Sequence, residues 1–85
     1  AEGASSRILE VEAPAWRLAI HPAGSLLAWG DGKGVIRIAE IATLKRVAEC
    51  SGHTAAVTGL EFDAMGKRLF SCSQDQTVRV WERKP

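Results

Sequence analysis

Hydrophobic and polar residues alternate with a period of two in short stretches along the whole chain. The stretches are rich in branched and aromatic side chains and are flanked by Gly, Pro, Asp or Ser. This pattern is typical of β-strands joined by tight turns. No window shows the longer period and the capping signals of a helix. The pattern therefore predicts an all-β chain with eight strands, at residues 7–12, 15–20, 25–29, 34–39, 45–50, 57–62, 67–73 and 77–82.

The eight predicted strands form two similar sets of four. When the chain is shifted by 42 positions, Leu18 falls on Leu60 and Arg37 falls on Arg79, and no gap is needed between these points. The strand before each set also repeats, because "SRILEVE" lies on "KRVAECS", and the second unit has extra residues there that include "GHT". A period of about 40–45 residues with four strands in each period indicates the blade of a β-propeller.

The second unit carries the most specific motifs. Gly52-His53, the stretch "LFSCSQD" and the stretch "TVRVW" that ends at Trp81 resemble a blade of the WD-repeat (WD40-type) β-propeller family. The resemblance covers nearly the whole chain, closely in residues 52–81 and more weakly in residues 7–40. It implies four-stranded antiparallel blades in which an outer strand precedes three inner strands.

This order of one outer strand followed by three inner strands divides the chain into three parts. Residues 1–6 are a linker or tail. Residues 7–44 are a degenerate first blade unit with the outer strand at 7–12, and residues 45–85 are a second unit with the outer strand at 45–50.

The resemblance also implies a buried hydrogen-bond network in the second unit. By position, its members are His53, Asp75, Trp81 and either Ser71 or Ser73. A buried carboxylate must be paired or strongly hydrogen-bonded, and a histidine can bridge two partners through its two ring nitrogens. The same Ser, His and Asp residues would suit a catalytic triad, but the blade explains their spacing and no nucleophile elbow is present. We therefore expect no catalytic residues and no enzyme activity.

The first unit departs from this pattern. Lys33 stands where the second unit has Asp75, Ala39 stands where it has Trp81, and no Gly-His pair precedes Trp16. The network therefore does not carry over to the first unit. The glycine-rich stretch "WGDGKGV" is not followed by a helix, so it predicts a tight turn rather than a phosphate site.

Composition and charge exclude several classes of function. The chain has 85 residues, of which 46% are hydrophobic and 25% charged, which is ordinary for a globular domain. Its net charge is +1 and no run of Lys or Arg exceeds two residues, so the footprint of a nucleic-acid-binding protein is absent. The apolar runs are far shorter than a membrane span. The sequence suggests no metal and no cofactor, because His53 has only Cys50 as a nearby co-ligand.

Two blades leave two apolar faces open, and repeat folds generally need at least three units. The outer strand at 7–12 has no inner set before it, and the inner set that ends at Trp81 has no outer strand after it. We therefore expect copies to assemble head to tail, each donating residues 7–12 to the next copy's residues 77–82. Three copies would make six blades and four copies eight. The alternative is that the missing blades belong to another polypeptide, with this chain a piece of a larger propeller.

The resemblance implies a binding platform for a protein or peptide ligand. The loops expected to carry it contain Trp16, Thr54, Ala55, Gln74 and Gln76. A carbohydrate-binding propeller is the alternative, and it would need exposed aromatic residues, for which only Trp16 and Trp29 are free.

Overall fold

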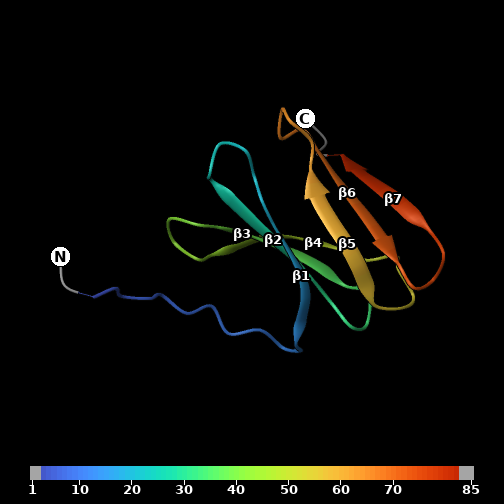
Figure 1. Ribbon diagram of the computed structural model, residues 1–85, viewed down its shortest axis with the longest axis horizontal. Coiled ribbons are helices and arrows are strands. Elements are labelled where there is room, and N and C mark those ends of the chain that lie inside the picture. The colour runs from blue at the N-terminus through green and yellow to red at the C-terminus, as the bar shows by residue number, and fades with distance from the viewer. Residues whose placement is uncertain (1–2, 83–85) are drawn as a thin grey trace.

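A computed structural model describes residues 3–82 of the chain, and in that part it consists of strands, turns and loops without a helix (Figure 1). No helix in this part is therefore long and apolar enough to cross a membrane. The all-β class predicted from the sequence is confirmed. The strands are β1 (Ala15–Ile20), β2 (Leu26–Asp31), β3 (Ile36–Glu40), β4 (Arg46–Cys50), β5 (Val57–Phe62), β6 (Arg68–Ser73) and β7 (Val78–Glu82).

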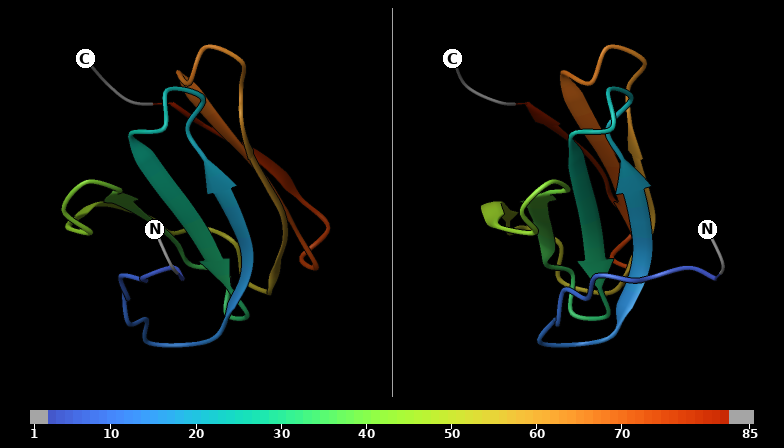
Figure 2. Two further views of the ribbon diagram at one scale, coloured as in Figure 1. Left: turned by 60° about the vertical axis from the view of Figure 1, so that its left-hand side comes forward. Right: turned by 90° about the vertical axis from the view of Figure 1, so that its left-hand side faces the viewer.

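The strands form two antiparallel sheets. The first sheet has the order β1-β2-β3-β4, and the second sheet has the order β5-β6-β7. Within each sheet, consecutive strands pair with each other through short turns, whereas β4 and β5 lie in different sheets and do not pair. Figure 2 shows the two sheets as adjacent layers, with β5 of the second sheet beside the first. The inner strands β1 and β5 lie next to each other, and the Arg17 side chain bridges them by donating to the Thr58 carbonyl at 2.8 Å.

The strand at 46–50 belongs to the first sheet, and this corrects the predicted unit boundary. We expected residues 45–50 to be the outer strand of the second unit, but β4 pairs with β3, with Arg37 opposite Glu49. The cause is the tight β3–β4 turn, in which Glu40 and Lys45 share a backbone hydrogen bond and Leu44 adopts a positive φ of 58°. This turn sends the chain straight back along β3. The sheets are therefore offset by one strand from the repeat units of the sequence.

The predicted strand at 7–12 is absent, and the second sheet has three strands among the described residues. The place beside β3 that the predicted first unit gave to residues 7–12 is occupied by β4, so these residues do not pair with β3. They run instead as an extended segment past the first sheet (Figure 1). Arg7 holds this segment by donating to the Ala42 carbonyl at 2.8 Å.

The hydrophobic core lies between the two sheets. Gly30 of β2 lies so close to β5 that an added Cβ would be 2.6 Å from the Cβ of Val57. This close approach lets Val57 and Ile36 become fully buried. Each square ångström of apolar surface removed from water stabilises the fold by about 25 cal/mol. The remaining core residues are Ala19, Ala28 and Leu69, with Ile38, Cys50, Leu60, Phe62 and Trp81 packed against them.

Each sheet also has one face that the other sheet does not cover. On the second sheet, Val78 is 73% exposed and Val80 is 54% exposed, with Phe70 beside them. On the first sheet, Leu18 and Ile20 of β1 are exposed. We call these surfaces the open face of the second sheet and the open face of the first sheet.

Candidate functional site

A chain of hydrogen bonds links the loop before β5 to the interior of the second sheet. Trp81 Nε1 donates to Ser71 Oγ at 2.8 Å, and Ser71 Oγ lies 2.8 Å from His53 Nε2. His53 Nδ1 lies 2.9 Å from Asp75 Oδ2. The His53 imidazole thus bridges the Ser71 hydroxyl and the Asp75 carboxylate through its two ring nitrogens. The His53 side chain is fully buried, so its own two bonds are shielded from water.

Asp75 connects two loops through its two carboxylate oxygens. Oδ1 accepts the backbone N–H and the hydroxyl of Thr77, in the β6–β7 turn. Oδ2 accepts the backbone N–H of Thr54 at 3.0 Å, in addition to the contact with His53. The Thr77 hydroxyl, together with His53 and the Thr54 N–H, holds the pKa of the Asp75 carboxyl well below its usual range. Asp75 is therefore an ionised anchor that ties the loop at 53–55 to the β6–β7 turn.

The two serines that the sequence left as alternatives have different places. Ser71 lies between His53 and Trp81, whereas Ser73 donates to the Ala55 carbonyl at 3.0 Å and accepts the Asp75 N–H at 3.0 Å. Ser71 therefore belongs to the hydrogen-bond chain that includes Trp81, and Ser73 holds the loop at 53–55 through the Ala55 carbonyl.

The first sheet has a tryptophan and an aspartate where the second sheet has these serines. Trp29, at the position of Ser71, is only 2% exposed, and the Arg46 guanidinium lies 5.5 Å from its ring centroid. Asp31, at the position of Ser73, accepts the Lys33 N–H at 2.8 Å and pairs with Arg37 at 3.1 Å. Burial raises the pKa of Asp31, but the N–H groups of the turn and Arg37 outweigh it and hold the pKa below its usual value.

Glu12 joins the N-terminal segment to this cluster. Its carboxylate accepts two hydrogen bonds of 2.6 Å from the Arg46 guanidinium, and Arg37 Nε lies 3.3 Å away. Arg46 also donates to the Glu10 carbonyl at 3.0 Å. We call Glu12, Arg37 and Arg46 the clamp, because together they hold residues 10–12 against the first sheet. Sequence reasoning missed the clamp: Glu12 and Arg46 are 34 positions apart, and no motif links them.

The clamp should be sensitive to acid. The paired Arg46 lowers the pKa of Glu12 from 4.5 to about 2. Because the folded-state pKa is depressed, the contribution of the clamp is fully present above pH 4.5 and is lost as the pH falls toward about 2. An NMR titration of the Glu12 side chain should therefore show a midpoint near 2. In an Arg46→Met variant the midpoint should return toward 4.5, and a midpoint already near 4.5 in the unchanged chain would disprove the clamp.

The predicted ligand loops lie at one end of the two sheets. Thr54, Gln74 and Gln76 are exposed and Ala55 is half-buried, around the loop that Asp75 anchors. Trp16, at the start of β1, is 45% exposed. Its indole covers Gly32 of the β2–β3 turn, where an added Cβ would lie 2.9 Å from Nε1.

Two further observations concern possible ligand sites. Trp29, which the carbohydrate-binding alternative needed, is buried under Arg46 and is not available to a sugar. Within residues 3–82, no three His, Cys, Asp or Glu side chains gather closely enough to hold a metal ion.

Comparison with known proteins now places the chain. The profile of the WD40 family, described as "WD domain, G-beta repeat", matches residues 44–82. The chain carries a WD40 repeat and has the fold of WD40 β-propellers. The resemblance that the sequence motifs indicated is thus confirmed, and the matched residues are those in which the motifs are most specific.

Individual relatives support this assignment. The chain is 39% identical over 61 residues to apoptotic protease-activating factor 1 of Danio rerio, covering 72% of this chain and 5% of that protein. It is 34% identical over 64 residues to pre-mRNA-processing factor 19 homolog 2 of Arabidopsis thaliana, covering 75% of this chain and 12% of that protein.

Solved structures show the same fold. The RRP9 WD40 repeats align with a TM-score of 0.73 at 37% identity, covering 76% of this chain and 20% of that one. The β-propeller domain of Myceliophteria thermophila Cps50 (Swd1) aligns with a TM-score of 0.82 at 23% identity, covering 86% of this chain and 22% of that one. The chain thus spans less than a quarter of the length of each of these relatives and structures.

Proposed function

We propose that this chain is a two-blade WD40 module that builds a propeller with further blades, primarily those of other copies of itself, and that the propeller is a protein-interaction scaffold. WD40 propellers are generally non-catalytic scaffolds for protein–protein interaction, and this provides the broad class. The proposal that copies assemble with each other rests on one observation. The residues on the two open faces occupy the same repeat positions as the residues on the two faces that pack against each other inside the chain.

The equivalence holds position by position along the repeat. On the open face of the second sheet, Val78 and Val80 occupy the positions that Ile36 and Ile38 occupy on the covered face of the first sheet. Ile36 is fully buried there by the second sheet, whereas Val78 is among the most exposed apolar residues. Exposed apolar surface of this kind favours a partner with a matching face.

The matching face is present at the other side of the same molecule. Leu18 and Ile20 on the open face of the first sheet occupy the positions of Leu60 and Phe62, which pack into the core from the second sheet. The contact between the two sheets can therefore recur between the second sheet of one copy and the first sheet of the next. Such a head-to-tail contact forms a ring when the rotation closes.

The ligand platform is proposed at the end of the sheets where Trp16, Thr54 and Gln74 are exposed. The hydrogen bonds of Asp75 and Ser73 hold the loop at 53–55 rigid, so a peptide would bind without a large ordering cost. A peptide panel should detect ligands for the assembled protein, and replacement of Trp16 by Ala should weaken them. Selective retention of the protein on a glycan panel instead would contradict a peptide-binding role.

Light scattering coupled to size exclusion tests the assembly. Three or four times the chain mass of 9.1 kDa would support a closed ring of six or eight blades. A monomer that unfolds without cooperativity would show that the missing blades come from another polypeptide. A stable, cooperatively unfolding monomer would refute the need for further blades.

A further inference from the structure

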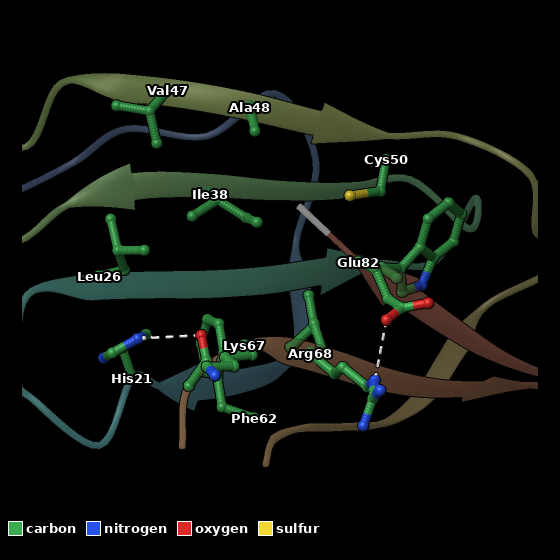
Figure 3. Close-up of a pocket in the computed structure, with 13 residues that line it drawn as sticks. His21, Leu26, Ile38, Val47, Ala48, Cys50, Phe62, Lys67, Arg68 and Glu82 are labelled. Carbon is green, nitrogen blue, oxygen red and sulfur yellow. Dashed lines mark hydrogen bonds and ion pairs between the residues drawn. The ribbon is translucent and has the colours of Figure 1, made fainter. Parts of the chain in front are cut away.

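A largely apolar pocket of about 190 Å³ opens between the two sheets, beside the outer edge of β7. Figure 3 shows Val47, Ala48 and Cys50 of β4 along one side of it, with Glu82 and Arg68 of the second sheet across from them. The pocket lies where the two sheets differ. Among the described residues, β4 is the fourth strand of the first sheet, and β7 of the second sheet has no partner on its outer side.

On the basis of the proposed assembly, we infer that residues 7–11 of a second copy pair with β7, in the register that places Glu10 opposite Arg79. The occupant is identified by the repeat in the sequence. Residues 6–12, "SRILEVE", correspond to residues 45–51, "KRVAECS", which contain β4 itself. A strand with the β4 pattern is therefore available in each copy, and residues 7–12 are not used as a strand in their own chain.

The pairing of β3 with β4 defines the register. In the first sheet, Ile36 lies opposite Cys50, Arg37 opposite Glu49, and Ile38 opposite Ala48. Transferred to the equivalent positions, this register places Val78 opposite Val11, Arg79 opposite Glu10, and Val80 opposite Leu9. Apolar residues then face apolar residues, and the arginine faces a carboxylate, which are the favourable cross-strand pairs.

The charges of the two copies are complementary at this point. Arg37 in the first sheet pairs with three carboxylates, those of Glu12, Asp31 and Glu49, at 3.1–3.3 Å. Its counterpart Arg79 has no carboxylate within ion-pairing distance in residues 3–82, and donates only to the Gly52 carbonyl at 3.1 Å. The Glu10 carboxylate likewise pairs with no cation in that part of the chain.

The alternative registers are less favourable. A shift by one residue would turn every side chain of the donated strand to the other face of the sheet. A shift by two residues in one direction would place Glu12 opposite Arg79 and would cost Glu12 its ion pairs with Arg46 and Arg37, whereas the proposed register gives up only the hydrogen bonds of Arg7 and of the Glu10 carbonyl. A shift by two in the other direction would place Ile8 opposite Arg79 and leave the arginine without a carboxylate. Ile8 and Val11 are exposed in the single chain, and Ile8 is 78% exposed, so the donated segment offers apolar side chains for burial in the contact.

A charge exchange tests the pairing of Glu10 with Arg79. Glu10→Arg and Arg79→Glu should each weaken self-association roughly three- to tenfold, because like charges then face each other across the strands. The Glu10→Arg/Arg79→Glu double variant should recover association to within about twofold of the unchanged protein. Lys45→Glu, a charge reversal in the exposed β3–β4 turn, is the control and should leave association unchanged. Analytical ultracentrifugation over a range of protein concentrations measures all four.

Disulfide trapping tests the register itself. In a Cys50→Ser/Cys72→Ser background, Val11→Cys together with Val78→Cys should link copies covalently under mild oxidation. Cys72 has to be removed because it lies opposite Val78 in the second sheet. Leu9→Cys together with Val78→Cys has its cysteines on the same face but two residues out of register, and should link far less. Non-reducing electrophoresis separates the two results.

The outcomes distinguish this inference from the proposed function. A monomeric unchanged protein would overturn both. An assembly that ignores the charge variants, or that links through residue 9 rather than residue 11, would overturn the register and leave the assembly standing. Should Arg79→Glu fail to fold by circular dichroism, Glu10→Arg still decides, because Glu10 lies outside every strand of the chain.

Discussion

Replacing Val80 by Asp should reduce self-association by about 100-fold or more, which corresponds to roughly 3 kcal/mol. Val80 lies on the open face of the second sheet and occupies the position of Ile38, which packs against the core between the sheets. In the assembly its side chain would be enclosed in the same way. An aspartate there would be a buried carboxylate without a partner, which is among the costliest changes at an apolar contact.

Sedimentation equilibrium of the Val80→Asp protein provides the measurement. The matched control is Met65→Asp, which adds the same charge at an exposed residue of the β5–β6 turn, away from the open face. The control should associate as the unchanged protein does. Circular dichroism should show that both variants keep their β-structure, because Val80 is 54% exposed in the single chain. Undiminished association of the Val80→Asp protein would show that this face is not the contact between copies.

Ser71→Ala should lower the free energy of unfolding by about 2–4 kcal/mol. The Ser71 hydroxyl lies 2.8 Å from both His53 Nε2 and Trp81 Nε1, and the residue is buried. Its removal leaves two polar atoms without this partner, and each unsatisfied buried group costs about 1–3 kcal/mol. Because the fold has a small core, this loss would be a large fraction of the total stability.

Urea unfolding at a fixed protein concentration measures this effect, since association also contributes to stability. Ser51→Ala is the matched control, because Ser51 is exposed in the loop after β4, and it should change the free energy by less than about 0.5 kcal/mol. Ser73→Ala provides a comparison inside the same loop system. It should cost less than Ser71→Ala, since the Ser73 hydroxyl bonds only to backbone groups. Equal stability of the Ser71→Ala and Ser51→Ala proteins would mean that the network adds nothing to folding.

The strands and the members of the network follow from local information. Period-two alternation locates β1 to β7 to within about two residues, because apolar residues recur at every second position of a strand and turn residues separate the strands. His53, Asp75 and Trp81 follow from the motif of the second unit, in which each residue has a definite place relative to a turn. The proposed role of the loops in binding a ligand remains a prediction from that motif.

Other features depend on which strands pair with each other, and the alternation of apolar and polar residues does not predict that pairing. Residues 45–50 read equally well as the first strand of one unit or the last strand of another, and the tight turn at 40–45 assigned them to the first sheet. Ser71 and Ser73 lie on the same face of β6. Ser71 is the one within hydrogen-bond distance of Trp81, and Ser73 bonds to the Ala55 carbonyl instead.

The sequence by itself therefore determined the repeat, the positions of β1 to β7 and the residues of the second unit's network, because alternation marks each strand and a motif with fixed places marks the network. Only the tertiary structure decided the sheet boundary and the clamp of Glu12 with Arg37 and Arg46. It also showed the equivalence between the open faces and the joined faces. The clamp and the match between the faces depend on contacts between residues more than 20 positions apart, which exist only after the sheets have packed, and the sheet boundary depends on a turn that alternation does not encode.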